Sequence, residues 1–549
     1  MPHDYSNTLC DWVPRIIVQG DDLPAQLGGV ALIVRGVMDY LEGDIHPGDI
    51  IYCNDPEMGN THLAEMNMFK PIFYEEELVF WAVQRSHMTD TGGGAAGTMN
   101  PNAEEIYAEG FRFPPIKLWK KGVLNQTMFD LILKNVRIPR AQLGDMRGQY
   151  ATVNIAEKRL LALLQKYGKQ TVKGAIEELL DRSEHRMRQE IARMPDGVYE
   201  GSAIMEDPGK GIGDCPIRVR VAIRGDSMRI ELQSREQVPS YINMYTAFAM
   251  SATYYAVLYY LEDAKLSHNA GSYRPIEMEF GPKGSLLNAQ IPAACGYSPM
   301  LDDIRDAICE ALAKAVPERA TGGFNHGPGL IFYGIDPRRN EPYVYLALEN
   351  LLGGGGARAT GMDGWPCIGL ACAGGAVTSP NIELLEYDKP IHIHSYQMQT
   401  DSACAGKWRG GMGSTIEVEF LDHDVKVTNW GEGYKYPAPD LLGARSVFHD
   451  KKVTLHTHWH PRDEEVRVIP ANSLVCLPAG THILSYIGGG GGIGDPFERD
   501  QQLVREDVRN GFVSLEGARQ EYGVVLDPKN QEIDLDATEG ARRIGSMSA

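Results

Sequence analysis

The sequence predicts a mixed α/β protein of the α+β type, a large body of several layers. Three observations support this prediction: strand-like apolar runs near the N-terminus, two amphipathic helical patterns in the middle, and a strand-rich C-terminal part. The 549 residues also exceed what one ordinary hydrophobic core accommodates. We expect five segments: an N-terminal strand-and-loop region (1–140), a helical segment (141–195), a mixed α/β region (196–380), a β-rich region (381–500) and a partly helical tail (501–549).

Short apolar runs separated by glycine, proline, asparagine and aspartate fill the stretch from about 49 to 120. This pattern is typical of strands joined by loops. Between 141 and 194 the apolar residues recur at i, i+3, i+4 and i+7, which predicts two amphipathic helices with Gly168 ending the first. A further helix is expected over about 302–316, where an acidic first turn opens the pattern and a proline follows it.

Alternation of apolar and polar residues returns after 197, in IRVRVAIRGDSMRIELQ, and predicts a hairpin that turns at Gly225 and Asp226. From about 388 onward the chain is mainly strand-like. The run from Tyr241 to Leu261 has no charge and is nearly long enough to span a bilayer. It carries many hydroxyl groups that need partners and no basic flank, so we expect a buried core helix.

Composition excludes several classes of function. The 73 acidic and 53 basic residues give a formal net charge of −20, which disfavours nucleic acid as a partner. The nine cysteines form no CxxC pair, so neither a disulfide framework nor a zinc knuckle is predicted, and a reducing cytoplasm fits best. The N-terminus shows no secretory signal, and no membrane association is expected.

Three glycine clusters punctuate the chain, at 351–365, 406–413 and 487–500. Such clusters mark positive-φ turns, tight backbone packing or close approach to a ligand. Loops near 92–94 and 353–356 are candidates to exclude water from a reaction site. The last cluster satisfies GxGxxG, but no βαβ unit surrounds it, so dinucleotide binding is disfavoured. The sequence contains no GxxxxGK[ST], so this chain supplies no ATP-binding loop of that type.

The stretch YCNDPEMGNTHLAEMN, followed by RSHMTDTGGG, gathers histidines and carboxylates at two expected strand ends. Adjacent strands would bring His62, Glu65 and His87 together as ligands for Zn, Mn or Fe, with open positions for water or substrate. Asp90 and Asp55 are candidates to complete the ligand shell or to orient an imidazole. The alternative is that all five are ordinary polar loop residues, because such spacings are common by chance.

Other polar groups compete for a functional role. The histidines of HIH (392, 394) and of HTHWH (456, 458, 460) alternate along expected strands, and a solvated strand face is the favoured explanation for both. Cys404 and Ser402 lie beside Asp401 in a loop of small residues, which leaves direct covalent catalysis as a weaker hypothesis.

Seven motifs, in order along nearly the whole chain, resemble one family, the B-type subunits of the hydantoinase, oxoprolinase and ketone carboxylase group. The motifs are NDPEMGNTHLAEM, RSHMTDTGG, GTMNPNAEEIYAEGFRFPPIKL, NVRIPRAQLGDMRGQ, DSACAGKWRGGMG, GGGGGIGDP and DVRNGFVSLEGARQEYGVVLD. In this family a B-type subunit works with an A-type subunit that binds ATP, and the pair activates a carbonyl by phosphorylation. The resemblance therefore implies a divalent metal at His62, Glu65 and His87, and an A-type partner that supplies the ATP site.

The resemblance leaves two reactions open. Our first expectation is a ligase that makes C–C bonds: ATP-dependent, biotin-independent carboxylation of an acetone-like or acetophenone-like ketone by bicarbonate, giving a 3-oxo acid. The alternative is ATP-dependent hydrolysis of a cyclic amide, and a third hypothesis is a scaffold subunit whose metal site has lapsed. The ion, Zn or Mn and otherwise Fe or Mg, would stabilise developing negative charge or activate water. Asp90 would orient His87, and Arg85 and Arg112 are candidates for carboxylate or phosphate contacts.

The sequence also departs from the pattern of the family it resembles. Glu65 stands where aspartate is more common, Ala64 stands where hydrolase relatives commonly have proline, and DSACAG replaces a more glycine-rich form. The departures at Ala64 and Glu65 tilt the expectation slightly towards carboxylation. Relatives usually have an extra segment before the DYS that begins here at Asp4, and we expect either that the segment is dispensable or that another subunit fills its place.

Overall fold

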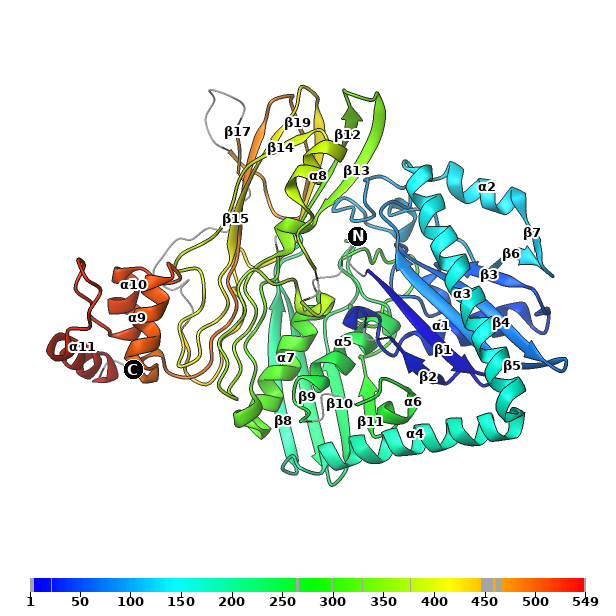
Figure 1. Cartoon of the computed structure of the whole chain (residues 1–549), viewed down its shortest axis with the longest axis horizontal. Coiled ribbons are helices and arrows are strands. Elements are labelled where there is room, and N and C mark those ends of the chain that lie inside the picture. The colour runs from blue at the N-terminus through cyan, green and yellow to red at the C-terminus, as the bar shows by residue number, and fades with distance from the viewer. Residues whose placement is uncertain are drawn as a thin grey trace.

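The computed structural model describes residues 4–20, 22–262, 266–297, 300–327, 329–375, 377–445, 458–460 and 467–547. Its architecture is mixed α+β, as predicted, with helices packed on several β-sheets. Figure 1 shows the N-terminal sheet with its helices on the right, a second sheet at the lower centre, the β-rich part above it and three C-terminal helices on the left. The five segment boundaries drawn from the sequence stay predictions.

Antiparallel strands form the N-terminal sheet in the order β2-β1-β5-β4-β3-β6-β7. They are β1 (Tyr5–Asp11), β2 (Ile16–Gln19), β3 (Ile50–Cys53), β4 (Glu65–Tyr74), β5 (Glu77–His87), β6 (Ile116–Lys120) and β7 (Val123–Leu124). Most of β4 is buried on both faces, because α1 (Val30–Leu41) packs on one side of the sheet and α3 (Pro139–Tyr167) on the other. The sheet therefore holds the ends of β4 and β5 in a fixed register.

The two amphipathic helices predicted between 141 and 194 are α3 and α4 (Lys169–Ile191). Gly168 separates them with a φ of +79°, a conformation that side chains rarely adopt, which is why the first helix stops there. A shorter helix, α2 (Gln126–Lys134), precedes α3. In Figure 1 the two long helices run along the outer side of the N-terminal sheet and then beneath it towards the second sheet.

The second sheet has the order β11-β10-β9-β8 and shares a core with the end of α4 and with three further helices. These elements are β8 (Gly197–Met205), β9 (Cys215–Arg224), β10 (Ser227–Gln233), β11 (Ile276–Glu279), α5 (Thr246–Leu258), α6 (Ala270–Tyr273) and α7 (Met300–Ala315). The β9–β10 hairpin and α7 confirm two predictions. Helix α5 lies within the uncharged run and is buried on nearly all sides, which confirms the predicted core helix. Across the described residues, no helix combines the length and the apolarity needed to cross a membrane.

In the β-rich part, two sheets face each other across an apolar core. Their orders are β13-β12-β16-β19 and β14-β15-β20-β17-β18. The elements are β12 (Gly329–Asp336), β13 (Glu341–Ala347), α8 (Ile382–Asp388), β14 (Ile391–Met398), β15 (Ser414–Phe420), β16 (Val425–Trp430), β17 (His458–His460), β18 (Arg467–Val468), β19 (Ser473–Leu477) and β20 (His482–Ile487). Phe332 of the first sheet meets Phe420 of the second edge to face, with ring centroids 4.9 Å apart.

The glycine clusters pack against one another along extended backbone. The N–H of Gly354 donates to the carbonyl oxygen of Gly488 at 2.9 Å, and that of Gly490 donates to Gly411 at 3.0 Å. A Cβ atom built on Gly354 would lie 2.0 Å from the backbone nitrogen of Gly490. Figure 1 shows these segments running side by side below β15. The cluster at 353–356 therefore packs tightly against other backbone, which is one of the roles expected of the glycine clusters, and its part in excluding water stays a prediction.

Three helices end the described chain: α9 (Gln501–Arg509), α10 (Leu515–Tyr522) and α11 (Leu535–Met547). The buried Arg499, which is 1% exposed, links these helices to the glycine clusters at 351–365, 406–413 and 487–500, which together form a glycine-rich layer. Its guanidinium donates to both carboxylate oxygens of Asp363 at 2.7 Å and to Asp507 at 2.8 Å. A bidentate pair of this kind fixes geometry as well as charge.

Candidate active site

The two strand ends singled out in the sequence meet in the structure. Glu65 is the first residue of β4, His87 is the last residue of β5, and the two are opposite each other in the ladder. His62 lies in the turn before β4, and its ring centroid is 5.2 Å from that of His87. Asn60 holds this turn, because its buried amide donates to the backbone carbonyls of His62 and Glu65, both at 2.8 Å. All three predicted ligands line one cavity.

Asp4 is a fourth member of this group, and sequence reasoning missed it. β1 pairs with β5, so the backbone N–H of His87 donates to the carbonyl oxygen of Asp4 at 3.0 Å. The carboxylate Oδ2 of Asp4 lies 3.8 Å from Nδ1 of His87, and Asp4 lines the same cavity. No spacing in the sequence predicts this contact, because the contact depends on which strand pairs with β5.

Burial governs the charge of these groups. It lowers the pKa of His62 well below its ordinary value, and the neighbouring His87 adds to the effect. Burial and then the nearby Asp4 raise the pKa of Glu65 to about 7, and burial raises the pKa of Asp4. A neutral imidazole is the form that binds a metal, and crowded carboxylates gain from a nearby cation. The donor set therefore suits a divalent ion.

Hydrogen bonding distinguishes the two carboxylates. Both oxygens of Glu65 accept from Nε2 of Gln26, at 2.9 and 2.8 Å. By contrast, Oδ1 of Asp4 and Nδ1 of His62 are buried and have no hydrogen-bond partner among the described residues. These four residues do not supply three ligand atoms within 4.8 Å of one another, so a bound ion would draw the side chains together. The two atoms without partners are the ones that an ion would satisfy.

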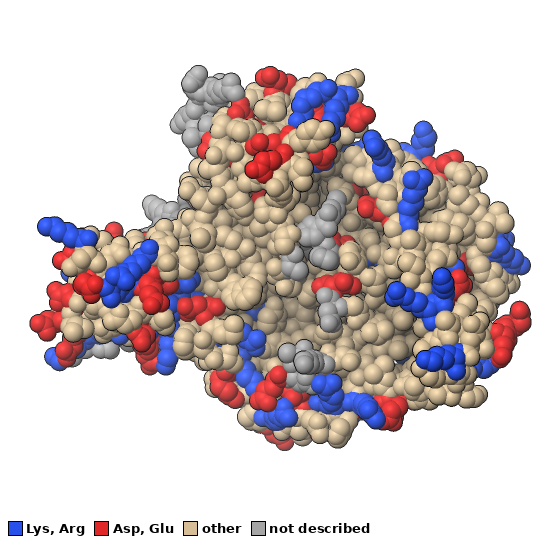
Figure 2. Space-filling view, in the orientation of Figure 1, with Lys and Arg blue, Asp and Glu red and all other residues tan. Residues whose placement is uncertain are grey.

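The cavity beside these residues has a volume of about 740 Å³. Apart from its polar end it is mainly apolar, with walls that include Leu23, Phe248, Val344, Leu348, Leu351, Leu370 and Trp430. In Figure 1 the start of the described chain lies between the N-terminal sheet and the elements α8 and β13, and Figure 2 shows this face hollowed there, with most charged side chains around the rim. An apolar chamber with a few convergent polar groups suits a small organic substrate.

Two other candidates on or after β5 have different surroundings. Arg85 is fully buried, and its Nε donates to Oδ1 of Asn67 at 2.7 Å, while its two terminal nitrogens have no hydrogen-bond partner in the described chain. Asp90 accepts from the backbone N–H and from Nη1 of Arg137, at 2.6 and 2.8 Å. The carboxylate beside His87 therefore comes from the residue before β1, and not from Asp90 as we expected.

Asp55 and Arg112 belong to a neighbouring turn. The carboxylate of Asp55 accepts from the backbone N–H of Glu57 and caps the short 3₁₀ helix Pro56–Met58. Nη1 of Arg112 lies 3.7 Å from Asp55 and 3.4 Å from Glu57. Neither residue lines the cavity that holds His62 and His87. Their described contacts are thus those of a turn and an ion pair.

The structure modifies the interpretation of the other histidines. His394 on β14 and His482 on β20 both approach Glu419 on β15, and the ligand atoms of the three lie within 4.8 Å of one another. Nε2 of His394 is 2.8 Å from Oε2 of Glu419. The prediction of a merely solvated face overlooked this carboxylate, because a neighbouring strand supplies it. His456 lies outside the described residues, and only the backbone of His458 and His460 is described.

The covalent hypothesis gains no support. Cys404 is buried, its thiol donates to the carbonyl oxygen of Arg445 at 2.9 Å, and burial raises its pKa well above the ordinary value. The hydroxyl of Ser402 donates to the carbonyl oxygen of Gln399 at 2.6 Å. Among the contacts described for Cys404 and Ser402, none involves a histidine. A buried thiol with a raised pKa is a poor nucleophile.

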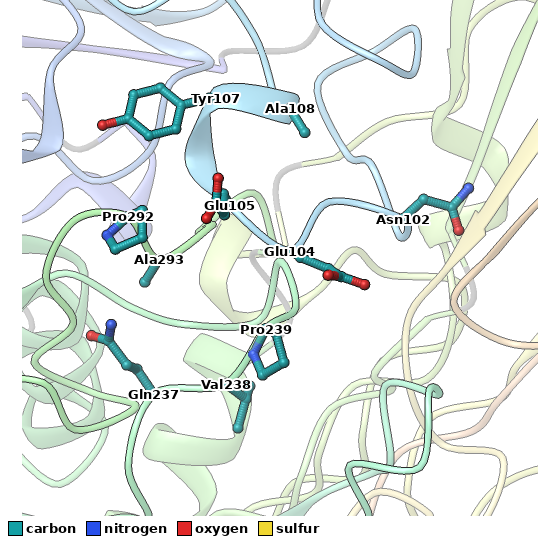
Figure 3. A pocket seen from close by; sticks show the side chains of 10 residues that line it. All are labelled: Asn102, Glu104, Glu105, Tyr107, Ala108, Gln237, Val238, Pro239, Pro292 and Ala293. Atoms are coloured by element: carbon teal, nitrogen blue, oxygen red, sulfur yellow. The ribbon is translucent and has the colours of Figure 1, made fainter.

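A second hollow, of about 700 Å³, has a different lining. Figure 3 shows its residues, which come from the segments 102–108, 237–239 and 292–293 and include Glu105, Tyr107 and Gln237. None of the site residues predicted from the sequence lines it. The cavity beside His62 and His87 is therefore the candidate active site.

Several known proteins are similar to this chain over most of its length. The β subunit of a caprolactamase from Pseudomonas jessenii is 41% identical over 99% of this chain and 93% of its own length. The B-type subunit of a putative D-/L-hydantoinase from a Pseudomonas species is 30% identical over 98% of this chain and 90% of its own. The delta subunit of acetophenone carboxylase from Aromatoleum aromaticum is 24% identical over 93% of this chain and 79% of its own.

Solved structures show the same fold. The crystal structure of the ATP-dependent caprolactamase from Pseudomonas jessenii superimposes with a TM-score of 0.92 at 39% identity, covering 99% of this chain and 94% of that one. A nucleotide-free acetone carboxylase structure gives a TM-score of 0.89 at 19% identity, covering 100% and 79%, and shows the fold alone. Residues 2–496 also match the family model described as hydantoinase B/oxoprolinase. This chain is a member of the hydantoinase B/oxoprolinase family.

Proposed function

We propose that this chain is the metal-binding subunit of an ATP-dependent enzyme that hydrolyses a cyclic amide, and that a partner subunit of the A type binds the ATP. The observation that carries the proposal is the cavity, in which metal-type donors stand at one end and apolar walls surround the rest. The identity of 41% with a caprolactamase subunit supports amide hydrolysis over the carboxylation that we expected first. The apolar walls favour a lactam with a hydrocarbon ring as substrate.

Asp4, His62 and His87 are the proposed ligands of a divalent ion. Asp4 replaces Glu65 in the set predicted from the sequence, because Glu65 is engaged by Gln26 while Asp4 and His62 each keep a buried atom without a partner in the described chain. When bound, such an ion supplies a Lewis acid for the negative charge that develops on an activated carbonyl. Zn²⁺ or Mn²⁺ suits two imidazoles and a carboxylate.

The residues around the ion would bind the substrate and balance its charge. Gln26 orients Glu65 at the polar end of the cavity, opposite His87 in the ladder. Burial lowers the pKa of Arg85 to about 10, against the raising effect of Glu65, so Arg85 keeps a positive charge near the site at neutral pH. The apolar walls would hold the ring of the substrate and keep bulk water from an activated intermediate.

Ketone carboxylation is the second candidate function. A specific observation favours it, because the acetophenone carboxylase subunit aligns over 93% of this chain. At 24% identity that relative is more distant than the caprolactamase subunit. Both reactions place a cation beside an activated carbonyl, so the geometry alone supports each of them.

The experiment that separates the two uses the complete complex with ATP and labelled bicarbonate. Amide hydrolysis predicts ATP-dependent opening of a lactam and no incorporation of label. Label recovered in a 3-oxo acid, with no lactam opened, would establish carboxylation instead. A His62→Ala complex tests the scaffold hypothesis, because a scaffold retains full activity without bound metal and the proposed enzyme does not.

A further inference from the structure

A second group of buried ligand-type side chains lies apart from the candidate active site. Asp303 and Asp306 are on α7, His326 is in the segment before β12, and Glu432 follows β16. All four are buried, with exposed fractions between 1% and 7%. One ligand atom from each of Asp303, His326 and Glu432 lies within 4.8 Å of the other two. None of these residues lines the cavity beside His62.

His326 is held in the orientation that a metal ligand needs. Its Nε2 lies 2.9 Å from Oδ2 of Asp306, so Asp306 accepts a hydrogen bond from the protonated nitrogen. The other ring nitrogen, Nδ1, faces Asp303 and is 3.7 Å from its Oδ1. In protein metal sites a carboxylate commonly binds one ring nitrogen and thereby directs the lone pair of the other at the ion. Arg305 pairs with Asp306, so the charge of this orienting carboxylate is already balanced.

The charges of Asp303 and Glu432 face a different cation, the imidazole of His326. Burial lowers its pKa, but the hydrogen bond to Asp306 and the nearby Asp303 outweigh this and raise it to about 10. Glu432 accepts from the hydroxyl of Tyr297 at 3.1 Å and from the backbone N–H of Glu206 at 3.0 Å, and both donors are neutral. Oδ2 of Asp303 is buried and has no hydrogen-bond partner in the described part of the chain. Two carboxylates this close and this deeply buried need a cation beside them. The imidazolium of His326 is that cation when no metal is bound, and a metal ion would take the place of its Nδ1 proton.

We propose that Asp303, His326 and Glu432 bind a divalent transition-metal ion, Zn²⁺ or Mn²⁺, in a second site. One neutral imidazole and two carboxylates form a ligand set for these ions, and the ion cancels the two negative charges. The three ligands come from α7, from the segment before β12 and from the end of β16. The ion therefore joins the second sheet's helix to the β-rich part and has a structural role. This inference does not depend on the proposed function.

The test measures the metal content of the purified complex. We choose isosteric variants, Asp303→Asn, Glu432→Gln and His326→Gln, to avoid cavities. The matched control is Asp302→Asn, the neighbouring buried acid on α7, whose Oδ1 accepts from Tyr255 at 2.9 Å and from the backbone N–H of Cys372 at 2.8 Å. Zn and Mn per chain are determined by elemental mass spectrometry after desalting.

Each of the three variants is expected to lose one ion per chain, whereas Asp302→Asn loses none. If the proposed first site also holds an ion, combining His62→Ala with His326→Gln lowers the content by two, and a loss of one ion in the double variant argues against the first site and not against this one. Folded variants that keep the metal content of the wild type overturn the inference and assign the balancing charge to protonated His326. If the variants do not fold, anomalous scattering from wild-type crystals decides: a Zn or Mn peak between the three side chains supports the site, and its absence overturns it.

Discussion

Oδ2 of Asp4 lies 3.8 Å from Nδ1 of His87, although the two residues are far apart in the sequence. The pairing of β1 with β5 produces this contact, and the pairing of β5 with β4 places Glu65 opposite the same histidine. Two carboxylates thus compete for the proposed metal site. Gln26 binds one of them, Glu65, through both oxygens. The geometry therefore predicts different consequences when each carboxylate is neutralised.

Asp4→Asn is expected to empty the site, because it removes a ligand that has no other partner for one of its oxygens in the described chain. Glu65→Gln is expected to weaken metal binding roughly 10- to 100-fold, as the loss of a supporting group does. Metal content and ATP-dependent activity of the complex measure both effects. Asp130→Asn, on the exposed side of α2, is the matched control and should retain metal and activity. Full occupancy in Asp4→Asn together with an empty site in Glu65→Gln would restore the ligand set drawn from the sequence.

Part of this site could be predicted from the sequence and part could not. His62, Glu65 and His87 occur at strand ends that show an abrupt change from apolar to polar residues, so their convergence followed from local pattern. Asp4 depends on the pairing of two strands distant in the chain, which no local pattern encodes. The orienting role given to Asp90 failed for a similar reason, because Arg137, which lies nearly fifty residues later, takes its carboxylate.

If the cavity binds the substrate as proposed, its apolar wall limits the size of that substrate. Val344 on β13 is 4% exposed and lines the cavity. Val344→Phe would place a ring in the space proposed for the substrate, so kcat/KM is expected to fall roughly tenfold or more, which is the scale of a misfit in an apolar pocket. Metal content should remain that of the wild type. Steady-state kinetics of the complex measure the change.

Ile335→Phe provides the comparison, because Ile335 lies on the adjacent strand β12 and is 47% exposed. It should leave kcat/KM within about twofold of the wild type, as surface substitutions usually perturb little. An equal loss of kcat/KM in the two variants would show that the effect comes from a disturbance of the paired strands β12 and β13 and not from the cavity.

The glycine-rich layer predicts a large contrast between two substitutions of the same kind. A Cβ atom at Gly354 would lie 2.0 Å from a backbone nitrogen and 2.1 Å from a backbone oxygen, so neighbouring main chain must shift. Gly354→Ala is expected to lower stability by about 3 kcal/mol or more, the upper range for overpacking. At Gly174 in α4 an added Cβ would meet nothing within 4 Å. Gly174→Ala should raise stability by roughly 0.5–1 kcal/mol, because alanine favours a helix.

Thermal unfolding of the two variants beside the wild type measures this contrast, and similar midpoints for both would contradict the packing described here. The sequence shows where the glycines are, but several physical causes produce the same composition. Only the three-dimensional neighbours of Gly354, which are other glycines at 411, 489 and 490, reveal that the cause is contact between backbones. The contact of His394 with Glu419 could not be predicted from the local sequence either, because Glu419 lies on another strand.

The buried carboxyl of Glu349 should make the free energy of unfolding depend on pH. Glu349 is 1% exposed, Oε2 accepts from the hydroxyl of Tyr345 at 2.5 Å, and Oε1 has no hydrogen-bond partner in the described residues. Burial raises its pKa from 4.5 to about 7. Between pH 4.5 and pH 7 the folded chain therefore binds a proton that the unfolded chain has released. Since stability rises with pH only where the unfolded state binds more protons, this group lowers stability as pH rises through that window.

Glu349→Gln removes the titrating group and with it this part of the pH dependence. The stability of the variant relative to the wild type should rise from pH 4.5 to pH 7 and level off above it, by up to about 3 kcal/mol. Unfolding midpoints measured at several pH values give the difference directly. Glu341 lies at the exposed start of the same strand as Tyr345. The unfolding midpoint of Glu341→Gln should therefore change with pH in the same way as that of the wild type. A constant difference between Glu349→Gln and the wild type across this range would mean that Glu349 is ionised in the folded protein, with its charge met by a group that the described contacts do not include.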